Sequence, residues 1–250
     1  MSSISFYETK KLNHEQYENL IKRSETDLSF FLEKVGPIIE AVRTEGDAAL
    51  VRYGKELDGA KLLNTNTLKV TTEEFDEAFN SVDADVIEAI QYGIANIKTF
   101  HEEQKPKAMS FKEIQPGAYA GDRYTPIRSV ALYVPRGKGS FPSVTMMTTV
   151  PGVVAGVPEL AIFTPPSPDG GVDAATLVAA RLAGVETVYK CGGAQAVAAA
   201  TFGTETIKPA LKIVGPGSPY VVAAKKQLAG LIDPGLPAGP SEAIVFADGS

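Results

Sequence analysis

The sequence predicts an α/β fold built on a parallel sheet, and two observations support that prediction. Beyond residue 130, short apolar runs rich in β-forming residues alternate four times with segments of helical length. This alternation is typical of successive βα units joined by right-handed crossovers. Glycine-rich turns follow three of the apolar runs, and ligands of open parallel sheets bind where the strands end in this way.

The N-terminal part reads as an arm followed by helices. Residues 1–25 are polar with scattered apolar side chains, so we expect either an arm lying on another surface or a frayed end. From Asp27 onward apolar residues recur at steps of three and four, which predicts a helix that Pro37 bends or delays. Asp47 then predicts the N-cap of a second helix over 48–57.

The next segment also predicts mostly helix. A short strand is expected over 68–71, and the sequence TTEEFDEAF from residue 71 predicts a short capped helix. Residues 85–104 form the clearest helical pattern, with His101 at the end of its apolar stripe. On that stripe we expect His101 to be a partly buried packing residue. Near residue 115 the composition changes from charged, helix-forming residues to glycine, proline and tyrosine. We place a domain boundary at about residue 130.

The four βα units follow in order along the chain. Strands are expected over 129–134, 159–164, 186–191 and 211–214, and helices over 142–156, 173–183, 194–202 and 219–228. In a parallel sheet all the loops that follow the strands open at one edge.

Three of these loops are candidates for binding a ligand: PRGKGSFPS at 135–143, GGAQA at 192–196 and GPGSPY at 215–220. Glycine serves where a ligand or a neighbouring backbone comes close, although βα turns also need it for geometry alone. Three such loops at one edge favour a ligand site, and the first, at a helix N-terminus, suits phosphate. The chain has no G-x-G-x-x-G fingerprint, so ordinary Rossmann pyrophosphate recognition is not predicted.

Composition excludes several classes of protein. The 250 residues are 44% hydrophobic and 22% charged, as in ordinary globular proteins. The net charge of −6, from 24 basic and 30 acidic residues, argues against a nucleic-acid binder. One cysteine excludes an intrachain disulfide framework and fits a reducing compartment. The N-terminus has no apolar signal-peptide core and no run is long enough to span a membrane, so we expect a cytoplasmic protein.

Residue types alone give no complete catalytic constellation. Cys191 follows an expected strand, but no histidine lies near it in sequence to activate the thiol. A small buried thiol is the commoner situation for a lone cysteine. His14 and His101 do not have metal-ligand spacing, and the chain has no C-x-x-C motif.

Several long motifs, taken together and in order, resemble the histidinol dehydrogenase family along nearly the whole chain. They are VRTEGDAALVRY at 42–53, ANIKTFHEEQ at 95–104, YVPRGKGSFPS at 133–143, VPGVVAGV at 150–157, CGGAQAVAAATFGTETI at 191–207, KIVGPGSPYV at 212–221 and LPAGPSEAIVFAD at 236–248. The resemblance implies an NAD-dependent, zinc-requiring, cytoplasmic homodimer. Such an enzyme oxidises the amino alcohol L-histidinol to L-histidine in two hydride transfers through an aldehyde, the last step of histidine biosynthesis.

The resemblance also implies a division of the chain into two incomplete Rossmann-like domains with an N-terminal arm. Residues 1–25 would be the arm that reaches the partner subunit, and 26–130 the first part of domain one. Residues 131–238 would form the NAD-binding βα domain, and 239–250 a strand that returns to domain one.

Carried over residue by residue, the resemblance implies that Tyr133, Gln195 and Ser218 contact the cofactor and that Ser241 contacts the substrate. Two positions depart from the family pattern. Ser218 stands where the family usually has asparagine, and loses the reach of the carboxamide. Arg136 stands where a glycine is usual, and either meets a phosphate or an anionic substrate or is a solvated surface residue.

The zinc ligands and the catalytic Glu-His pair of the family would fall beyond Ser250. We therefore expect no catalytic residue and no metal ligand within this chain, and no turnover by the chain alone. Two other hypotheses stay open. One is a paralogous dehydrogenase of another polar alcohol, such as a sulfonated diol, and the other is a non-catalytic NAD-binding or subunit-interaction module.

Overall fold

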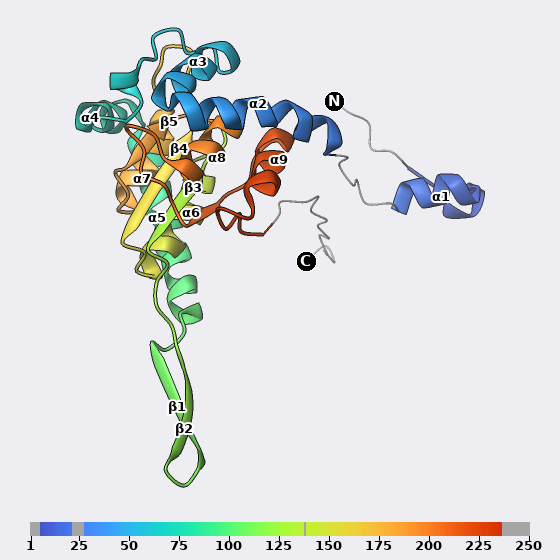
Figure 1. Cartoon of the computed structure of the whole chain (residues 1–250), viewed down its shortest axis with the longest axis vertical. Coiled ribbons are helices and arrows are strands. Elements are labelled where there is room, and N and C mark those ends of the chain that lie inside the picture. Colours follow the sequence, from blue (N-terminus) through green and yellow to red (C-terminus); the bar gives the residue numbers. More distant parts are fainter. Residues whose placement is uncertain (1–5, 22–27, 138, 237–250) are drawn as a thin grey trace.

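The computed structural model describes residues 6–21, 28–137 and 139–236. Its centre is a parallel sheet of four strands in the order β5-β4-β3-β6 (Figure 1). The strands are β3 (Ser129–Tyr133), β4 (Glu159–Thr164), β5 (Val188–Lys190) and β6 (Lys212–Val214). Numbered by their own order along the chain, they read 3-2-1-4, which is the order that begins a dinucleotide-binding sheet. The predicted α/β fold is confirmed.

The crossover helices lie within two residues of the expected ranges. They are α6 (Pro142–Val154), α7 (Ala174–Leu182), α8 (Gly193–Phe202) and α9 (Pro219–Leu228). Proline is the first residue of both α6 and α9, where its fixed φ suits a helix and its missing N–H costs nothing.

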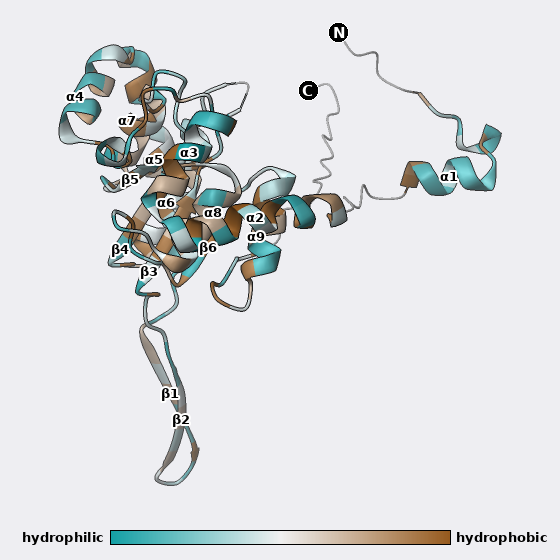
Figure 2. Ribbon diagram, turned by 45° about the horizontal axis from the view of Figure 1, so that its top comes forward, coloured by the Kyte–Doolittle hydropathy of each residue, from teal (hydrophilic) through white to brown (hydrophobic). Residues whose placement is uncertain are grey.

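Helices cover both faces of the sheet. The N-terminal helices are α2 (Ser29–Glu45), α3 (Asp47–Leu57), α4 (Thr72–Ser81) and α5 (Ala84–Gln104). The core cluster on one face contains residues of α2, α3, α8 and α9, and the cluster on the other contains residues of α4, α5 and α7, with α6 packed against it. Alternate strand residues divide between the two clusters, with Tyr133 in the first and Leu132 in the second. Figure 2 shows hydrophobic segments gathered around α2, α6 and α8, and a mostly hydrophilic α1 (His14–Ile21).

Three local expectations need correction. Pro37 does not set the start of its helix, because α2 begins at Ser29 and contains Pro37 in its interior. Asp47 is the first residue of α3, and Gly46 takes the N-cap position expected for Asp47. The strand expected over 68–71 is reduced to an isolated bridge between Lys69 and Tyr189 beside β5. By contrast, the predicted cap of α4 is present, because the Thr71 side chain accepts a bond from the backbone of Glu74 and that carboxylate accepts one from the backbone of Thr71.

A β-hairpin that the sequence analysis did not anticipate projects from the body (Figure 1). It consists of β1 (Met109–Gln115) and β2 (Ala118–Arg123), paired antiparallel, and every residue of both strands is exposed. A Cβ at Gly121 would lie 2.7 Å from Cδ1 of Phe111. The Phe111 ring therefore covers the glycine of the opposite strand.

The predicted N-terminal arm is represented by a 3₁₀ turn at Thr9–Lys11 and by α1, neither of which has a buried residue. Its contact with a partner subunit and the domain boundary at residue 130 stay predictions. The expected return strand over 239–250, with Ser241, lies outside the described residues. Within residues 6–21, 28–137 and 139–236, no helix has the length and apolar character needed to cross a membrane.

Candidate functional site

The strand order reverses between β3 and β6, and ligands of open parallel sheets bind near such a switch point, beyond the carboxyl ends of the strands. The backbones are in close contact here. Gly215 has a φ of 115°, and a Cβ on it would lie 2.1 Å from the carbonyl oxygen of Tyr133. Ser218, the N-cap residue of α9, is exposed, and its side chain makes no capping hydrogen bond. Ser218 thus lies at a helix N-terminus beside the switch point.

Tyr133 and Gln195 both lie beside Gly193, the first residue of α8. Tyr133 is 3% exposed, and its hydroxyl oxygen accepts a hydrogen bond of 3.0 Å from the backbone N–H of Gly193. Gln195 is 1% exposed, and a Cβ on Gly193 would lie 2.5 Å from its Oε1. The structure therefore brings together two of the residues expected to contact the cofactor, with Gly193 between them.

Two buried oxygens near this point have no hydrogen-bond partner among the described residues: Oε1 of Gln195 and Oδ2 of Asp58. Asp58 follows the last residue of α3 and was missed by the sequence analysis. Burial raises its pKa to about 6, although the positive charge of Arg136 opposes the shift. Buried polar atoms are nearly always hydrogen-bonded in native proteins, so unpartnered ones point to a missing ligand or water.

The phenol of Tyr133 stays neutral. Burial raises its pKa, and the nearby charge of Asp58 adds to that shift. A neutral phenol that already accepts from Gly193 keeps its own proton for a further acceptor.

Cys191 is buried, at 2% exposure, and its burial raises the pKa of the thiol strongly. Since the thiolate is the nucleophile, a thiol held in its protonated form is unreactive. His101 is half-buried on α5 with its ring edge-on to Phe100 at 5.3 Å between centroids. This packing agrees with the expectation from the apolar stripe.

Arg136 links two loops at the same edge of the sheet. Its side chain is exposed, and its Nη1 donates a hydrogen bond of 3.3 Å to the carbonyl oxygen of Pro166, in the loop after β4. The guanidinium has five donors, so this single bond leaves it able to bind an anion. Its charge also acts on Asp58.

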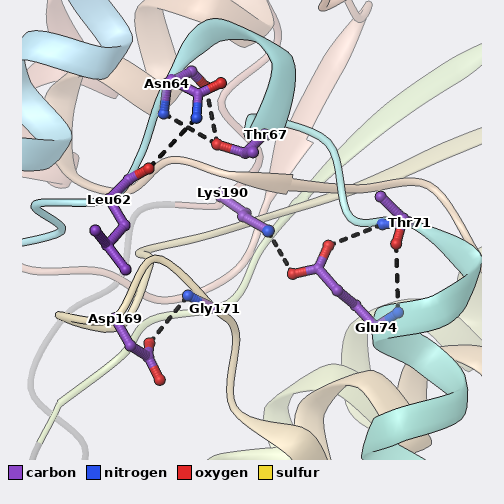
Figure 3. A network of polar contacts seen from close by, with 8 residues as sticks. All are labelled: Leu62, Asn64, Thr67, Thr71, Glu74, Asp169, Gly171 and Lys190. Atoms are coloured by element: carbon purple, nitrogen blue, oxygen red, sulfur yellow. Dashed lines mark hydrogen bonds and ion pairs between the residues drawn. The ribbon is translucent and has the colours of Figure 1, made fainter.

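Lys190, the last residue of β5, has a structural role. It is 3% exposed, and its ammonium pairs with the carboxylate of Glu74, the residue that also caps α4 (Figure 3). Figure 3 also shows the bond from the backbone of Asn64 to Thr67 and the bond from the backbone of Gly171 to Asp169, both 3.0 Å long. These contacts fix the loops beside α4 and after β4.

The described part of the chain offers no cluster of three or more His, Cys, Asp or Glu side chains that could hold a metal ion. These described residues therefore do not fit a zinc site.

Asp58→Asn is expected to stabilise the protein at about pH 8 and to lose that advantage on acidification. In the folded protein the pKa of Asp58 is about 6, above the ordinary value of 3.8 expected in the unfolded chain. Protonation of Asp58 therefore stabilises the fold. This stability is fully present below the unfolded-state pKa and is lost as the pH rises through the folded-state pKa. Asparagine removes this dependence. Melting temperatures of both proteins, measured between about pH 8 and pH 4, should converge toward low pH, and a constant difference would contradict the assignment.

Comparison with known proteins gives a consistent result. A family model described as histidinol dehydrogenase matches residues 21–250. A histidinol dehydrogenase homolog of Rhizobium meliloti (strain 1021) is 73% identical over 248 residues, which are 99% of this chain and 54% of that protein. A histidinol dehydrogenase of Synechocystis sp. is 45% identical over 241 residues, or 95% of this chain and 55% of that protein.

The fold comparison agrees. The crystal structure of histidinol dehydrogenase from Elizabethkingia anophelis matches with a TM-score of 0.84 at 35% identity, and the match covers 92% of this chain and 52% of that chain. This chain thus spans about half the length of the relatives it matches. With the family model matched over most of its residues and the fold shared, the chain belongs to the histidinol dehydrogenase family.

Proposed function

We propose that the full-length protein is an NAD-dependent dehydrogenase that oxidises a polar primary alcohol to the acid through the aldehyde, with L-histidinol as substrate and L-histidine as product. Family membership supports the reaction. The observation that supports the cofactor assignment is the dinucleotide-type strand order of the sheet. The buried, unpartnered carboxamide oxygen of Gln195 at the N-terminus of α8 adds to it.

In this proposal the residues of the chain bind and orient the cofactor. Gln195 offers its carboxamide, Tyr133 its hydroxyl proton, and Ser218 a hydroxyl at the start of α9. The N-termini of α8 and α9 present backbone N–H groups that favour phosphate. NAD, when bound, accepts the hydride. We assign the substrate contact to Ser241 from the resemblance alone.

The zinc that the family implies would have to be held by residues outside the described part of this chain. Homodimer formation and a cytoplasmic location belong to the same proposal.

Steady-state kinetics of the full-length protein test the proposal. We expect NADH to form with L-histidinol, two equivalents per L-histidine produced, and Gln195→Leu to raise the KM for NAD by about tenfold or more through the lost hydrogen bonds. The matched control is Gln227→Leu on α9. NAD binding without oxidation of any alcohol would instead favour a non-catalytic module, and absence of NAD binding would remove the cofactor assignment.

A second candidate is oxidation of a different polar alcohol, such as a sulfonated diol. Four relatives that are 56% to 73% identical to this chain are named histidinol dehydrogenase homologs, whereas four named histidinol dehydrogenase are 38% to 45% identical. Arg136, exposed at the edge of the sheet, adds a cation suited to an anionic group.

Arg136→Gly separates the two substrates. If the substrate is an anionic diol, the variant should lose about tenfold or more in kcat/KM for the diol, since a charge-assisted hydrogen bond is worth about 1.5–3 kcal/mol. Arg136→Lys should recover part of this loss. Clear turnover of L-histidinol at ordinary efficiency, with no oxidation of the diol, would remove the second candidate. Unchanged cofactor affinity and substrate preference would make Arg136 a solvated surface residue.

A further inference from the structure

The loop between β6 and α9, residues 215–218 with the sequence GPGS, is held at three points. Gly215 lies against the end of β3, because a Cβ on it would come within 2.1 Å of the carbonyl oxygen of Tyr133. Gly217 lies against the first turn of α9, where a Cβ would come within 2.5 Å of Cγ1 of Val221. The third point is a hydrogen bond to the carbonyl oxygen of Gly215.

Lys225 donates this hydrogen bond from α9, about two turns beyond the loop. Its Nζ lies 2.8 Å from the carbonyl oxygen of Gly215. Side chains on a helix point back toward its N-terminus, so the lysine stem runs toward the loop that precedes α9. Gly215, Gly217 and Lys225 line one cavity of about 430 Å³. The loop and the ammonium group are therefore parts of one local structure.

The burial of Lys225 is costly. The residue is 8% exposed, and a cation loses favourable hydration when it leaves water. An apolar side chain of similar length would fill the same space without this cost, and replacing buried ionic groups by apolar ones is often neutral or stabilising. The ammonium is therefore better explained by the carbonyl that it holds than by a contribution to stability.

Few charges surround Lys225. Burial lowers its pKa to about 8, and the charge of Lys212 on β6 adds to that shift. Lys212 is itself paired with Asp233 at 2.6 Å. Lys226 lines the same cavity but is exposed. Of the two helices packed against α9, α8 has no titratable side chain and α2 has its charged side chains exposed to solvent.

We propose that Lys225 is a positioning residue for cofactor binding, because its ammonium holds the loop 215–218 in the conformation that presents Ser218 to the cofactor. This inference rests on the proposed use of NAD. Lys225 acts through the carbonyl of Gly215 and needs no contact with NAD itself. A charged donor forms a hydrogen bond about twice as strong as a neutral one, so loss of the proton loosens the loop. NAD affinity should therefore fall as the pH rises through the pKa of Lys225.

The stability of the fold should change with pH in the opposite direction. The pKa of Lys225 is about 8 in the folded protein, below the ordinary value of 10.5, so the unfolded chain binds more protons between these two values. Relative to Lys225→Met, which lacks the titrating group, the wild type should become more stable over this interval in urea denaturation. A fall in NAD affinity that accompanies a rise in stability does not come from partial unfolding.

Calorimetric titration of the full-length protein with NAD, between about pH 7 and about pH 9.5, tests the proposal. We expect the wild type to lose about threefold or more in affinity over this interval. Lys225→Met should bind about tenfold more weakly than the wild type at the lower pH, with no such dependence. Lys225→Arg keeps its charge throughout, so it should restore most of the affinity and hold it at the higher pH. The control is Lys226→Met, which should behave as the wild type.

Four results would overturn the positioning role while leaving NAD use intact. They are a wild-type affinity that does not change with pH, wild-type affinity in Lys225→Met, a pH profile of Lys225→Arg identical to that of the wild type, and an equal loss in Lys226→Met. Absence of NAD binding by the wild type would overturn the proposed function and this inference together. If melting temperatures show that Lys225→Met is not folded, the pH profiles of the wild type and Lys225→Arg decide.

Discussion

Asp47→Ala is expected to lower the free energy of unfolding by about 3–5 kcal/mol, since it removes hydrogen bonds to a buried charge and leaves their donors unpaired. Asp47 opens α3 and is 5% exposed. Its carboxylate accepts a bond of 2.5 Å from the hydroxyl of Thr204 and another from the hydroxyl of Thr206. These bonds attach the corner between α2 and α3 to the loop after α8. Urea denaturation of the full-length protein measures the loss.

Variants of the partner residues calibrate this prediction. Thr206→Val removes one donor and keeps the shape, so it should cost about 1–2 kcal/mol. Thr44→Val is the matched control, because its hydroxyl bonds only to backbone carbonyls within the exposed surface of α2. A loss below about 1 kcal/mol for Asp47→Ala would mean that water replaces the two hydroxyls at little cost.

Gly215→Ala is expected to lower the free energy of unfolding by about 3–5 kcal/mol, because unfavourable backbone conformation and overpacking would both contribute. The φ of 115° disfavours any side chain, and the new Cβ would lie 2.1 Å from the carbonyl oxygen of Tyr133. Relief of this overlap would force β3 and the loop after β6 apart. We therefore also expect weaker NAD binding near this switch point, measured by calorimetry alongside denaturation.

Substitutions at two other glycines separate the cost of the backbone conformation from the cost of overpacking. Gly184 has a φ of 87° with no atom within 4 Å of an added Cβ, so Gly184→Ala should cost only about 1–2 kcal/mol for its left-handed conformation. At Gly230 an added Cβ would likewise meet no atom within 4 Å, and φ lies outside the positive range. Gly230→Ala should be neutral or slightly stabilising. Equal losses at Gly184 and Gly215 would show that the contact with Tyr133 is unimportant.

The βα half of the chain could be predicted because each of its elements carries a local signal. The helix over 219–228 begins at a proline and was placed correctly to the residue. The hairpin over 109–123 was missed because both of its faces are exposed. Without a buried face no alternation of apolar and polar residues is required, and alternation is the main signal for a strand.

The candidate site was predictable only in part. Tyr133 and Gln195 were reached through the resemblance, yet their environment depends on contacts between distant residues, such as the bond from Gly193 to a hydroxyl 60 positions away. Asp58 belongs to no recognisable motif, since a single aspartate after a helix is common on protein surfaces. Its burial and its unpartnered oxygen exist only because the end of α3 lies near the loops that follow β3 and β4.

The N-terminal helices that cover the sheet are synthesised before the sheet is complete. α5 ends at Gln104, whereas β6 ends at Val214, and at about 5–20 residues per second a ribosome needs on the order of ten seconds for the segment between them. During that time the apolar stripes of α2 and α5, with Val35 and Ile90, face a sheet that is still incomplete. Until the last strand emerges, the nascent chain therefore exposes apolar surface of the kind that promotes aggregation and that chaperones shield.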